Sequence, residues 1–324
     1  MMTTNIGKLR TDFVANTAME NQSTLYNDNL ELYLTQIGRL FDIPSIVNAT
    51  QGNQAVIDYY TVNKLLYRLG HNWEGFMHCG LSYDGKNKKE DFQEHARICE
   101  RYIRDTNAKK VLELGYGMGP NSAFLARRNP LVTFDGIDLT NEPLKRFTKI
   151  PNLHFQLGDF HDLSAFEDDA YDIVFTFEVF CHSTNKPHAL REVKKKLKKN
   201  GLFIVIDAYR RDRSKQLNQS EHNMAKLIEH CFALETFEYI EDVEGYMQEE
   251  FSIARAQDVT QHILPCMAKA HWSRYYFSHP MFARAVNKLL PFDLVKNIII
   301  ALLIPISVQR QIACYYIHVL KNDK

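Results

Sequence analysis

The sequence lacks several features that would place it in broad classes of protein. Its 39 Lys and Arg residues balance 39 Asp and Glu residues, so no overall charge attracts it to nucleic acid. Its six cysteines are scattered without a C-x-x-C pair, which argues against both a metal site and a disulfide framework. A reducing compartment is the simplest fit, and we expect the protein to be cytoplasmic.

Long hydrophobic runs are also missing. The first residues, MMTTNIGKLRTDF, contain no apolar signal core, so no secretion signal is predicted. The most hydrophobic run, residues 298–306, is far shorter than the roughly twenty residues that span a bilayer. We interpret it as a buried helix. A wall of an apolar substrate pocket and a peripheral membrane contact through 289–306 are the alternatives.

The most informative stretch is KKVLELGYGMGPNS, residues 109–122. A short apolar strand is followed by a glycine-rich turn and the start of a helix. Glycines allow positive φ and let a ligand approach the backbone, and a helix N-terminus offers unpaired N–H groups. The turn can therefore hold a nucleotide-like ligand. A glycine turn that merely ends a strand is the structural alternative.

The spacing of the glycines indicates which ligand. A dinucleotide site has the pattern G-x-G-x-x-G, whereas Gly115, Gly117 and Gly119 alternate and follow Glu113. Asp138 ends the next strand-like run, at roughly the twenty-residue separation expected of a carboxylate that binds ribose hydroxyls. The pattern therefore favours an enzyme with another nucleotide-like cofactor over a dinucleotide-binding dehydrogenase.

The rest of the chain alternates between strand and helix patterns. Alternation of this kind implies a parallel sheet with right-handed crossovers. Strands are predicted at 111–114, 132–137, 153–156, 172–177, 202–206, 251–256 and 312–320. Helices are predicted at 30–41, 53–67, 89–105, 188–199, 221–231, 241–250 and from 258 through 275. We divide the chain into an N-terminal helical arm (1–105), a core (106–210), a helical cap (211–310) and a final strand (311–324).

Acidic and histidine side chains follow several of these strands. Asp159 and Phe160 come after the third strand, Glu178 and His182 after the fourth, and Asp207 ends the fifth. A histidine of near-neutral pKa can take a proton from a hydroxyl, an amine or a carbon acid. A turn role for Asp159 and a structural role for His182 are the alternatives.

The sequence E-x-G-x-G-x-G with a later acid resembles motif I of the class I S-adenosylmethionine (SAM) methyltransferases. The resemblance implies a Rossmann-like α/β fold, a mostly parallel seven-stranded sheet with helices on both faces and a helical cap. It also implies that SAM is the cofactor and S-adenosylhomocysteine (SAH) the product. The implied cofactor contacts are Glu113, Gly115 and Gly117 for the methionine part, Asp138 for the ribose, and Asp159 and Phe160 for the adenine. Leu139 is a further implied cofactor contact.

A narrower resemblance covers roughly residues 59–207. The segment from Glu178 to His182, EVFCH, followed by LKKNGLF, is similar to the sterol C-methyltransferase pattern, which tocopherol and natural-product methyltransferases share in layout. The resemblance implies that Tyr60 or its neighbour Tyr59, together with the loop of Trp73, closes over SAM. Glu178 and His182 then line the reaction centre, with Glu178 also at the cofactor. The implied substrate pocket consists of Tyr67, Trp73, Phe76, His78 and Asp207.

This sequence departs from the sterol pattern by having fewer aromatic residues before the glycine turn. Sterol C-methylation must stabilise a carbocation, for which aromatic faces are well suited. We therefore keep the prediction of methyl transfer but do not predict a sterol as the acceptor. We expect transfer to a small hydrophobic acceptor, lipid-, isoprenoid- or polyketide-like, with His182 as base, Glu178 orienting it and carbon slightly favoured. An O- or N-methyltransferase, or a SAM-binding protein without catalysis, are the alternatives. No nucleic-acid partner is expected.

Overall fold

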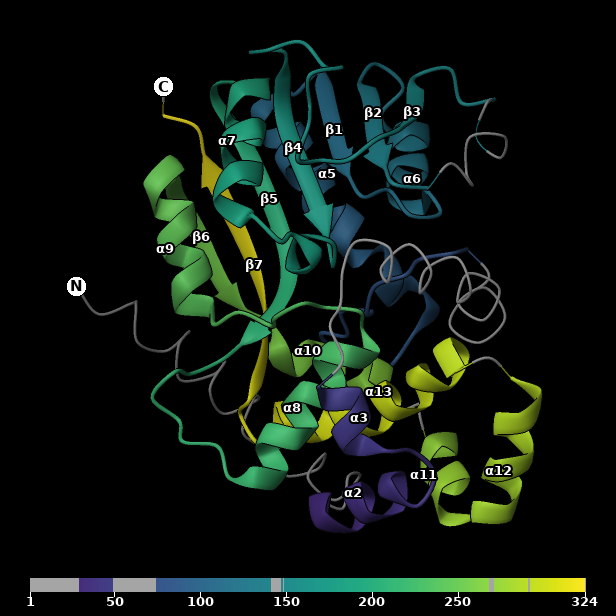
Figure 1. The fold of residues 1–324 in the computed structure, drawn as a ribbon. Coiled ribbons are helices and arrows are strands. Elements are labelled where there is room, and N and C mark those ends of the chain that lie inside the picture. The colour runs from purple at the N-terminus through teal and green to yellow at the C-terminus, as the bar shows by residue number, and fades with distance from the viewer. Residues whose placement is uncertain are drawn as a thin grey trace, which may run out of the picture.

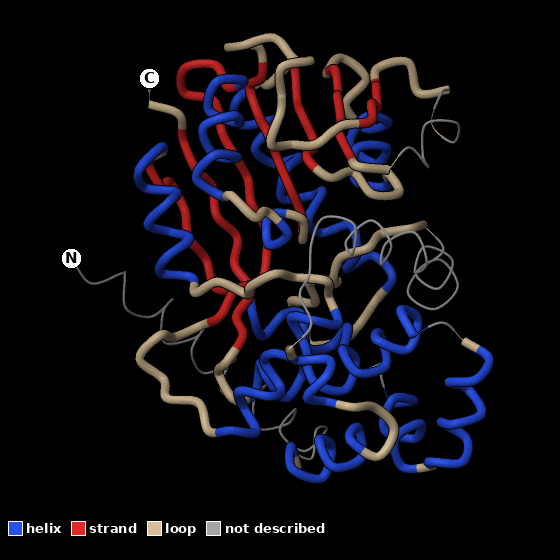
Figure 2. The backbone as a smooth tube through the Cα atoms, viewed as in Figure 1, coloured by secondary structure: helices blue, strands red, loops and turns tan. Residues whose placement is uncertain are grey.

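The computed structural model describes residues 29–48, 74–140, 147, 149–267, 271–290 and 292–323. A twisted sheet forms one half of the molecule, and a group of helices forms the other half (Figure 1). The two halves are easily distinguished when strands and helices are coloured separately (Figure 2). The carboxyl ends of the central parallel strands point toward the helical half, so this sheet edge lies where the two halves meet.

The sheet has seven strands in the order β3-β2-β1-β4-β5-β7-β6. Strands β1 to β5 are parallel to one another, and β7 runs antiparallel to both β5 and β6. The prediction of a mostly parallel, seven-stranded sheet is confirmed. The strands are β1 (Lys110–Leu114), β2 (Thr133–Asp138), β3 (Leu153–Leu157), β4 (Tyr171–Phe177), β5 (Leu197–Arg210), β6 (Ser252–Asp258) and β7 (Ala313–Lys321).

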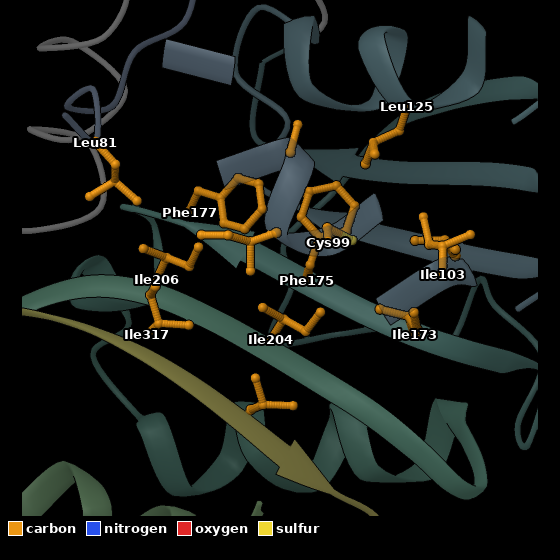
Figure 3. Packing of buried hydrophobic residues seen from close by; sticks show 14 of the residues in the cluster. Leu81, Cys99, Ile103, Leu125, Ile173, Phe175, Phe177, Ile204, Ile206 and Ile317 are labelled. Carbon is orange, nitrogen blue, oxygen red and sulfur yellow. The ribbon is translucent and has the colours of Figure 1, made fainter. Parts of the chain in front are cut away.

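Both faces of the sheet are covered, which explains why its strands are continuous apolar runs. Successive residues point to opposite faces: Ile173 and Ile204 belong to one apolar cluster, and Val174 and Phe203 to the other. The first cluster includes residues of α5 (Glu94–Thr106), which follows η2 (Lys89–Gln93), of α6 (Pro120–Arg128) and of α10 (Thr260–Met267). Figure 3 shows Cys99 of α5 against this face. The opposite face packs against α7 (Lys186–Lys196) and α9 (Ile240–Glu250).

The helical half has an apolar core of its own. Its members are α2 (Leu30–Gly38), α3 (Ile43–Val47), α8 (Gln219–Cys231), α11 (His271–Ser278), α12 (Pro280–Leu289) and α13 (Phe292–Gln309). Ile299 and Leu303 of α13 are fully buried there, which confirms the interpretation of 298–306 as a buried helix. The helix also continues through Pro305, because packing on all sides stabilises it more than local propensity does. Among the described residues, no helix is long and apolar enough to cross a membrane.

Several predicted boundaries differ from the structure. Helix α7 ends at Lys196 rather than at 199, because Leu197 already pairs with Tyr171 of β4. The helical region expected from 258 starts later, since Asp258 still belongs to β6. The helix predicted at 53–67 and the arm before residue 29 lie outside the described residues. The division into four segments stays a prediction; in the structure the helical half combines helices from 30–47, 219–231 and 271–309.

Candidate functional site

A cavity that is open to solvent lies at the carboxyl ends of β1, β2 and β4. Open α/β sheets bind ligands at this edge. The predicted site residues on its wall are His78, Gly115, Gly117, Asp138, Leu139, Phe160, Glu178 and His182. The wall also includes residues that the sequence did not single out, among them Met77, Met118, Asn121, Phe177 and Val179.

The glycine turn after β1 forms the floor of the cavity. Gly115, Gly117 and Gly119 all have positive φ, of 71°, 53° and 75°, and the Gly119 N–H donates to the Tyr116 carbonyl at 2.7 Å. A Cβ on Gly115 would come within 2.4 Å of Val179. A Cβ on Gly117 would meet only the Met77 sulfur, at 3.2 Å. The turn therefore leaves bare backbone exposed to a ligand, and a side chain at either position would disturb it.

Asp138 ends β2 beside this turn. Its Oδ2 accepts the Gly117 N–H at 2.8 Å, and its Oδ1 accepts the N–H and the hydroxyl of Thr140, each at 2.8 Å. These bonds fix the orientation of the carboxylate at the cavity wall. Leu139 and Phe160 supply apolar wall near it, which matches their predicted positions.

Asp159 is placed differently from the prediction that it binds adenine. Its Oδ1 accepts the His161 N–H at 2.9 Å and lies 2.7 Å from the ring Nδ1 of the same histidine. Asp159 does not line the cavity, although the next residue, Phe160, does. The aspartate forms a local turn with its neighbours, which is ordinary chemistry for Gly-Asp sequences.

Glu178 follows β4 in the left-handed region, with φ 51°, which is uncommon for a residue with a side chain. Its Oε1 accepts the Cys79 N–H and the Tyr315 hydroxyl, each at 2.7 Å. Burial raises the pKa of this carboxyl, and the two hydrogen bonds partly oppose that effect. The structure thus holds a partly desolvated carboxylate at a fixed position on the wall.

His182 lies in the short 3-10 turn η4 (Phe180–His182) after Glu178. Burial lowers the pKa of His182 to about 4, and the Lys186 charge adds to the effect. Burial also lowers the pKa of His78, whose Nδ1 lies 2.9 Å from the Cys79 carbonyl. Both imidazoles are therefore neutral near pH 7 and add no positive charge to the wall.

Two buried hydrogen-bonded chains continue behind the wall. Tyr315 connects Glu178 to His95, whose Nε2 lies 2.8 Å from the phenol oxygen. His78 contacts Asn121 at 3.1 Å, and the Asn121 amide contacts Glu113 at 3.4 Å. Glu113 was predicted to hold the methionine part of SAM, yet it does not line the cavity. It lies one layer deeper, and burial raises its pKa to about 7.

Two residues predicted for the substrate pocket are also displaced from the wall. Asp207 is fully buried (0% exposed), and its carboxylate accepts the Cys181 N–H at 2.9 Å and the Ala208 N–H at 2.8 Å. It stabilises the η4 turn that carries His182, because it accepts the Cys181 N–H within that turn. Phe76 packs in a small buried cluster with Phe92 and Cys266. Tyr60, Tyr67 and Trp73 lie outside the described residues.

Sequence reasoning missed the residues that hold Glu178. Tyr315 lies in a strand that was predicted only from its apolar pattern, and it is 137 positions away from Glu178. Cys79 contributes a backbone N–H, which any residue type supplies. His95 lies on the buried face of α5, among residues that form core. No local spacing signals these contacts; only the antiparallel return of β7 beside β5 brings them together.

The donor set on the wall fits SAM better than a dinucleotide. Among the described residues that line the cavity, there are two carboxylates, Asp138 and Glu178, and no lysine or arginine. Such a wall favours a ligand with a cationic centre, and aromatic faces such as those of Phe160 and Phe177 favour it further. A pyrophosphate would lack cationic partners here. Across the described residues, no cluster of His, Cys, Asp and Glu is arranged to hold a metal ion.

Comparisons with known proteins agree with this geometry. A family model described as a methyltransferase domain matches residues 105–269, which is more than half of the chain. Sterol 24-C-methyltransferase of Saccharomyces cerevisiae is 26% identical over 183 residues, 55% of this chain and 47% of that protein. A probable phthiotriol/phenolphthiotriol dimycocerosates methyltransferase 2 of Mycobacterium ulcerans is 32% identical over 106 residues, 32% of this chain and 41% of that protein. The chain thus spans less than half the length of these two relatives.

Solved structures share the fold. The cyclopropane synthase MmaA2 of Mycobacterium tuberculosis superposes with a TM-score of 0.63 at 16% identity, covering 85% of this chain and all (100%) of that one. At this identity the similarity concerns the fold. Together with the family match and the alternating-glycine turn, it shows that the chain belongs to the methyltransferase domain family, in its class I SAM-dependent form.

Proposed function

We propose that this protein transfers the methyl group of SAM to a small hydrophobic acceptor of lipid or isoprenoid type, with carbon favoured as the methylated atom. The observation that carries the proposal is a single cavity that joins the glycine turn and Asp138 to the buried carboxylate of Glu178. The apolar side chains of Met77, Met118 and Val179 support a hydrophobic acceptor. The names of the sterol and dimycocerosates relatives point to the same substrate class.

We assign the binding of the donor to one side of the cavity. The bare backbone of Gly115 and Gly117 would lie against its amino-acid part, Asp138 would accept its ribose hydroxyls, and Leu139 with Phe160 would enclose its adenine. When bound, SAM supplies an electrophilic methyl group on a positively charged sulfur. The protein accelerates such a transfer mainly by orienting the reactants and excluding water.

We assign proton acceptance to Glu178 and orientation of the acceptor to His182, the reverse of the roles inferred from sequence. A base is most effective when its pKa lies near the working pH. Burial raises the pKa of Glu178 toward that range, whereas burial lowers the pKa of His182 to about 4, away from it. As the new bond to the methyl group forms, the acceptor loses one proton. Glu178 Oε1 is held by Cys79 and Tyr315, which leaves Oε2 to take that proton.

Methyl-labelled SAM incubated with lipid extracts tests this proposal, with products identified by mass spectrometry. We expect label in an apolar product, and the methylated atom follows from fragmentation. Glu178→Gln should lower turnover by about 10²–10⁴-fold, the usual contribution of a positioned base. Glu244→Gln on α9, where the carboxylate faces His318 away from the cavity, is the matched control and should not change turnover.

If SAM binds and its label never leaves it with any extract, the protein is a SAM-binding protein without methyl transfer. If label appears only in polar metabolites, the hydrophobic acceptor is wrong while methyl transfer stands.

A further inference from the structure

Helix α12 presents apolar side chains to solvent. Met281 is 85% exposed and Leu289 is 82% exposed, and with Ala285 they recur every four residues along one face. Residues at this spacing lie above one another on a helix. Phe282, about half exposed, widens the same face. We call Met281, Phe282, Ala285 and Leu289 the α12 apolar strip.

The α12 apolar strip is not the side by which the helix is attached to the protein. Ala283, on the opposite side, is fully buried, and Asn287 accepts a hydrogen bond from the Tyr276 hydroxyl of α11. An ordinary surface helix buries its apolar stripe and exposes polar residues. The inner side of α12, with Ala283 and Val286, already packs against the core of the helical half. Its large outward apolar residues are additional to that contact, so burial in this chain does not explain the strip.

Basic side chains border the strip. Arg284 and Lys288 are exposed one turn apart along one edge of it, and neither forms an ion pair within the described part of the chain. Residues 271–290 contain no Asp or Glu. Although the whole chain has no net charge, this end of the molecule is locally cationic. Figure 1 shows α11 and α12 together at the outer end of the helical half, away from the sheet.

Aromatic side chains continue the surface onto α11. Tyr275 is exposed and stacks on His279, with ring centroids 4.0 Å apart, and its ring lies 5.9 Å from that of Phe282. Amphipathic aromatic residues such as tyrosine favour the boundary between water and lipid. The surface thus combines an apolar strip, an aromatic edge and unpaired positive charge.

We propose that this surface docks on a membrane containing anionic phospholipids, with α12 lying in the plane of the headgroups. Helices with an outward apolar face flanked by Lys and Arg bind membranes in this way, and anionic lipids attract basic residues near the surface. A uniformly anionic surface complements a patch without acidic residues. The contact is made by α12 and not by 298–306, which is buried in α13. The proposal does not depend on methyl transfer.

Sedimentation with lipid vesicles tests the proposal. The full chain should pellet with vesicles of equal parts phosphatidylcholine and phosphatidylglycerol, and much less with phosphatidylcholine alone. Each basic residue near an anionic surface contributes about fivefold to binding, so Arg284→Glu with Lys288→Glu should weaken it by tenfold or more. Met281→Ser with Leu289→Ser should also weaken it about tenfold, since both lose apolar burial.

Matched controls separate this surface from general charge and hydrophobicity. Arg191→Glu with Lys199→Glu makes the same charge change on the sheet half, and Leu131→Ser removes a leucine that is 86% exposed elsewhere. Both should bind vesicles like the unaltered chain. The proposal is overturned if the chain does not pellet, if the controls lose as much binding as the α12 variants, or if sedimentation velocity shows that the strip instead forms a dimer.

Discussion

Replacing Tyr315 by Phe tests how the structure tunes Glu178. The change removes the hydroxyl that donates to Glu178 Oε1 at 2.7 Å and leaves the Cys79 N–H in place. A hydrogen bond to a charged group is worth about 1.5–3 kcal/mol. Because this bond stabilises only the carboxylate, its loss favours the protonated acid, and one pH unit corresponds to about 1.4 kcal/mol. The titration midpoint of Glu178 should therefore rise by about one to two pH units.

The assay is carboxyl ¹³C NMR of glutamate-labelled protein across a pH series, with the Glu178 signal assigned from Glu178→Gln. Tyr209→Phe is the matched control, because its buried hydroxyl makes no hydrogen bond within the described part of the chain. Thermal unfolding checks that both variants are folded. An unchanged midpoint in Tyr315→Phe, or an equal rise in Tyr209→Phe, would refute the assignment of Tyr315 as a positioning residue. The acid limb of methyl transfer should move in the same direction, since only the carboxylate accepts a proton.

Three further predictions concern residues on the cavity wall or buried behind it. Burial raises the pKa of Glu113 from 4.5 to about 7, so the folded state holds an extra proton and its stability falls as pH rises from about 4 to 7. Glu113→Gln should remove this dependence and raise the free energy of unfolding at pH 8 by about 1–3 kcal/mol. Urea unfolding at about pH 4 and at pH 8 would show this, and the exposed Glu249→Gln should have no such effect. His182→Ala should slow methyl transfer and leave SAM affinity unchanged; equal turnover would remove any catalytic role for this histidine. Asp207→Ala should slow transfer comparably, because the η4 turn loses the acceptor of its Cys181 N–H. If both substitutions act through the position of His182, the double variant should be no slower than His182→Ala alone.

Much of the fold was predictable because its signals are local. The strand at 111–114 and the glycine turn after it could be recognised from apolar runs, positive-φ residue types and helix-start chemistry. All seven strands were anticipated within a few residues, apart from β5, which extends well beyond 202–206 to Leu197–Arg210. The extension to Arg210 depends on pairing with β7, and the extension back to Leu197 on pairing with Tyr171 of β4. The sequence pattern of one segment does not contain its partner.

The candidate site was predictable only in part, for a related reason. Gly115, Gly117 and Asp138 reach the wall because strand ends in a parallel sheet share one edge. Glu113 and Asp207 also lie near the carboxyl ends of their strands, yet their side chains are buried behind the wall. The direction in which each side chain points depends on the pleat of its strand and on which nearby backbone N–H groups need an acceptor. Neighbouring strands and turns decide these two factors, and residue type does not.

Isothermal titration of the purified chain with SAH most directly tests whether the cavity at the glycine turn binds SAM and its product. We predict saturable binding that Gly117→Ala weakens at least tenfold, because its Cβ would enter the wall beside Met77. Gly85→Ala is the control: Gly85 has a similar positive φ of 73° with no atom near its Cβ, so this variant carries the backbone strain alone and should bind normally. Heat of binding that is absent from the folded unaltered chain, or equally reduced in both variants, would contradict the account.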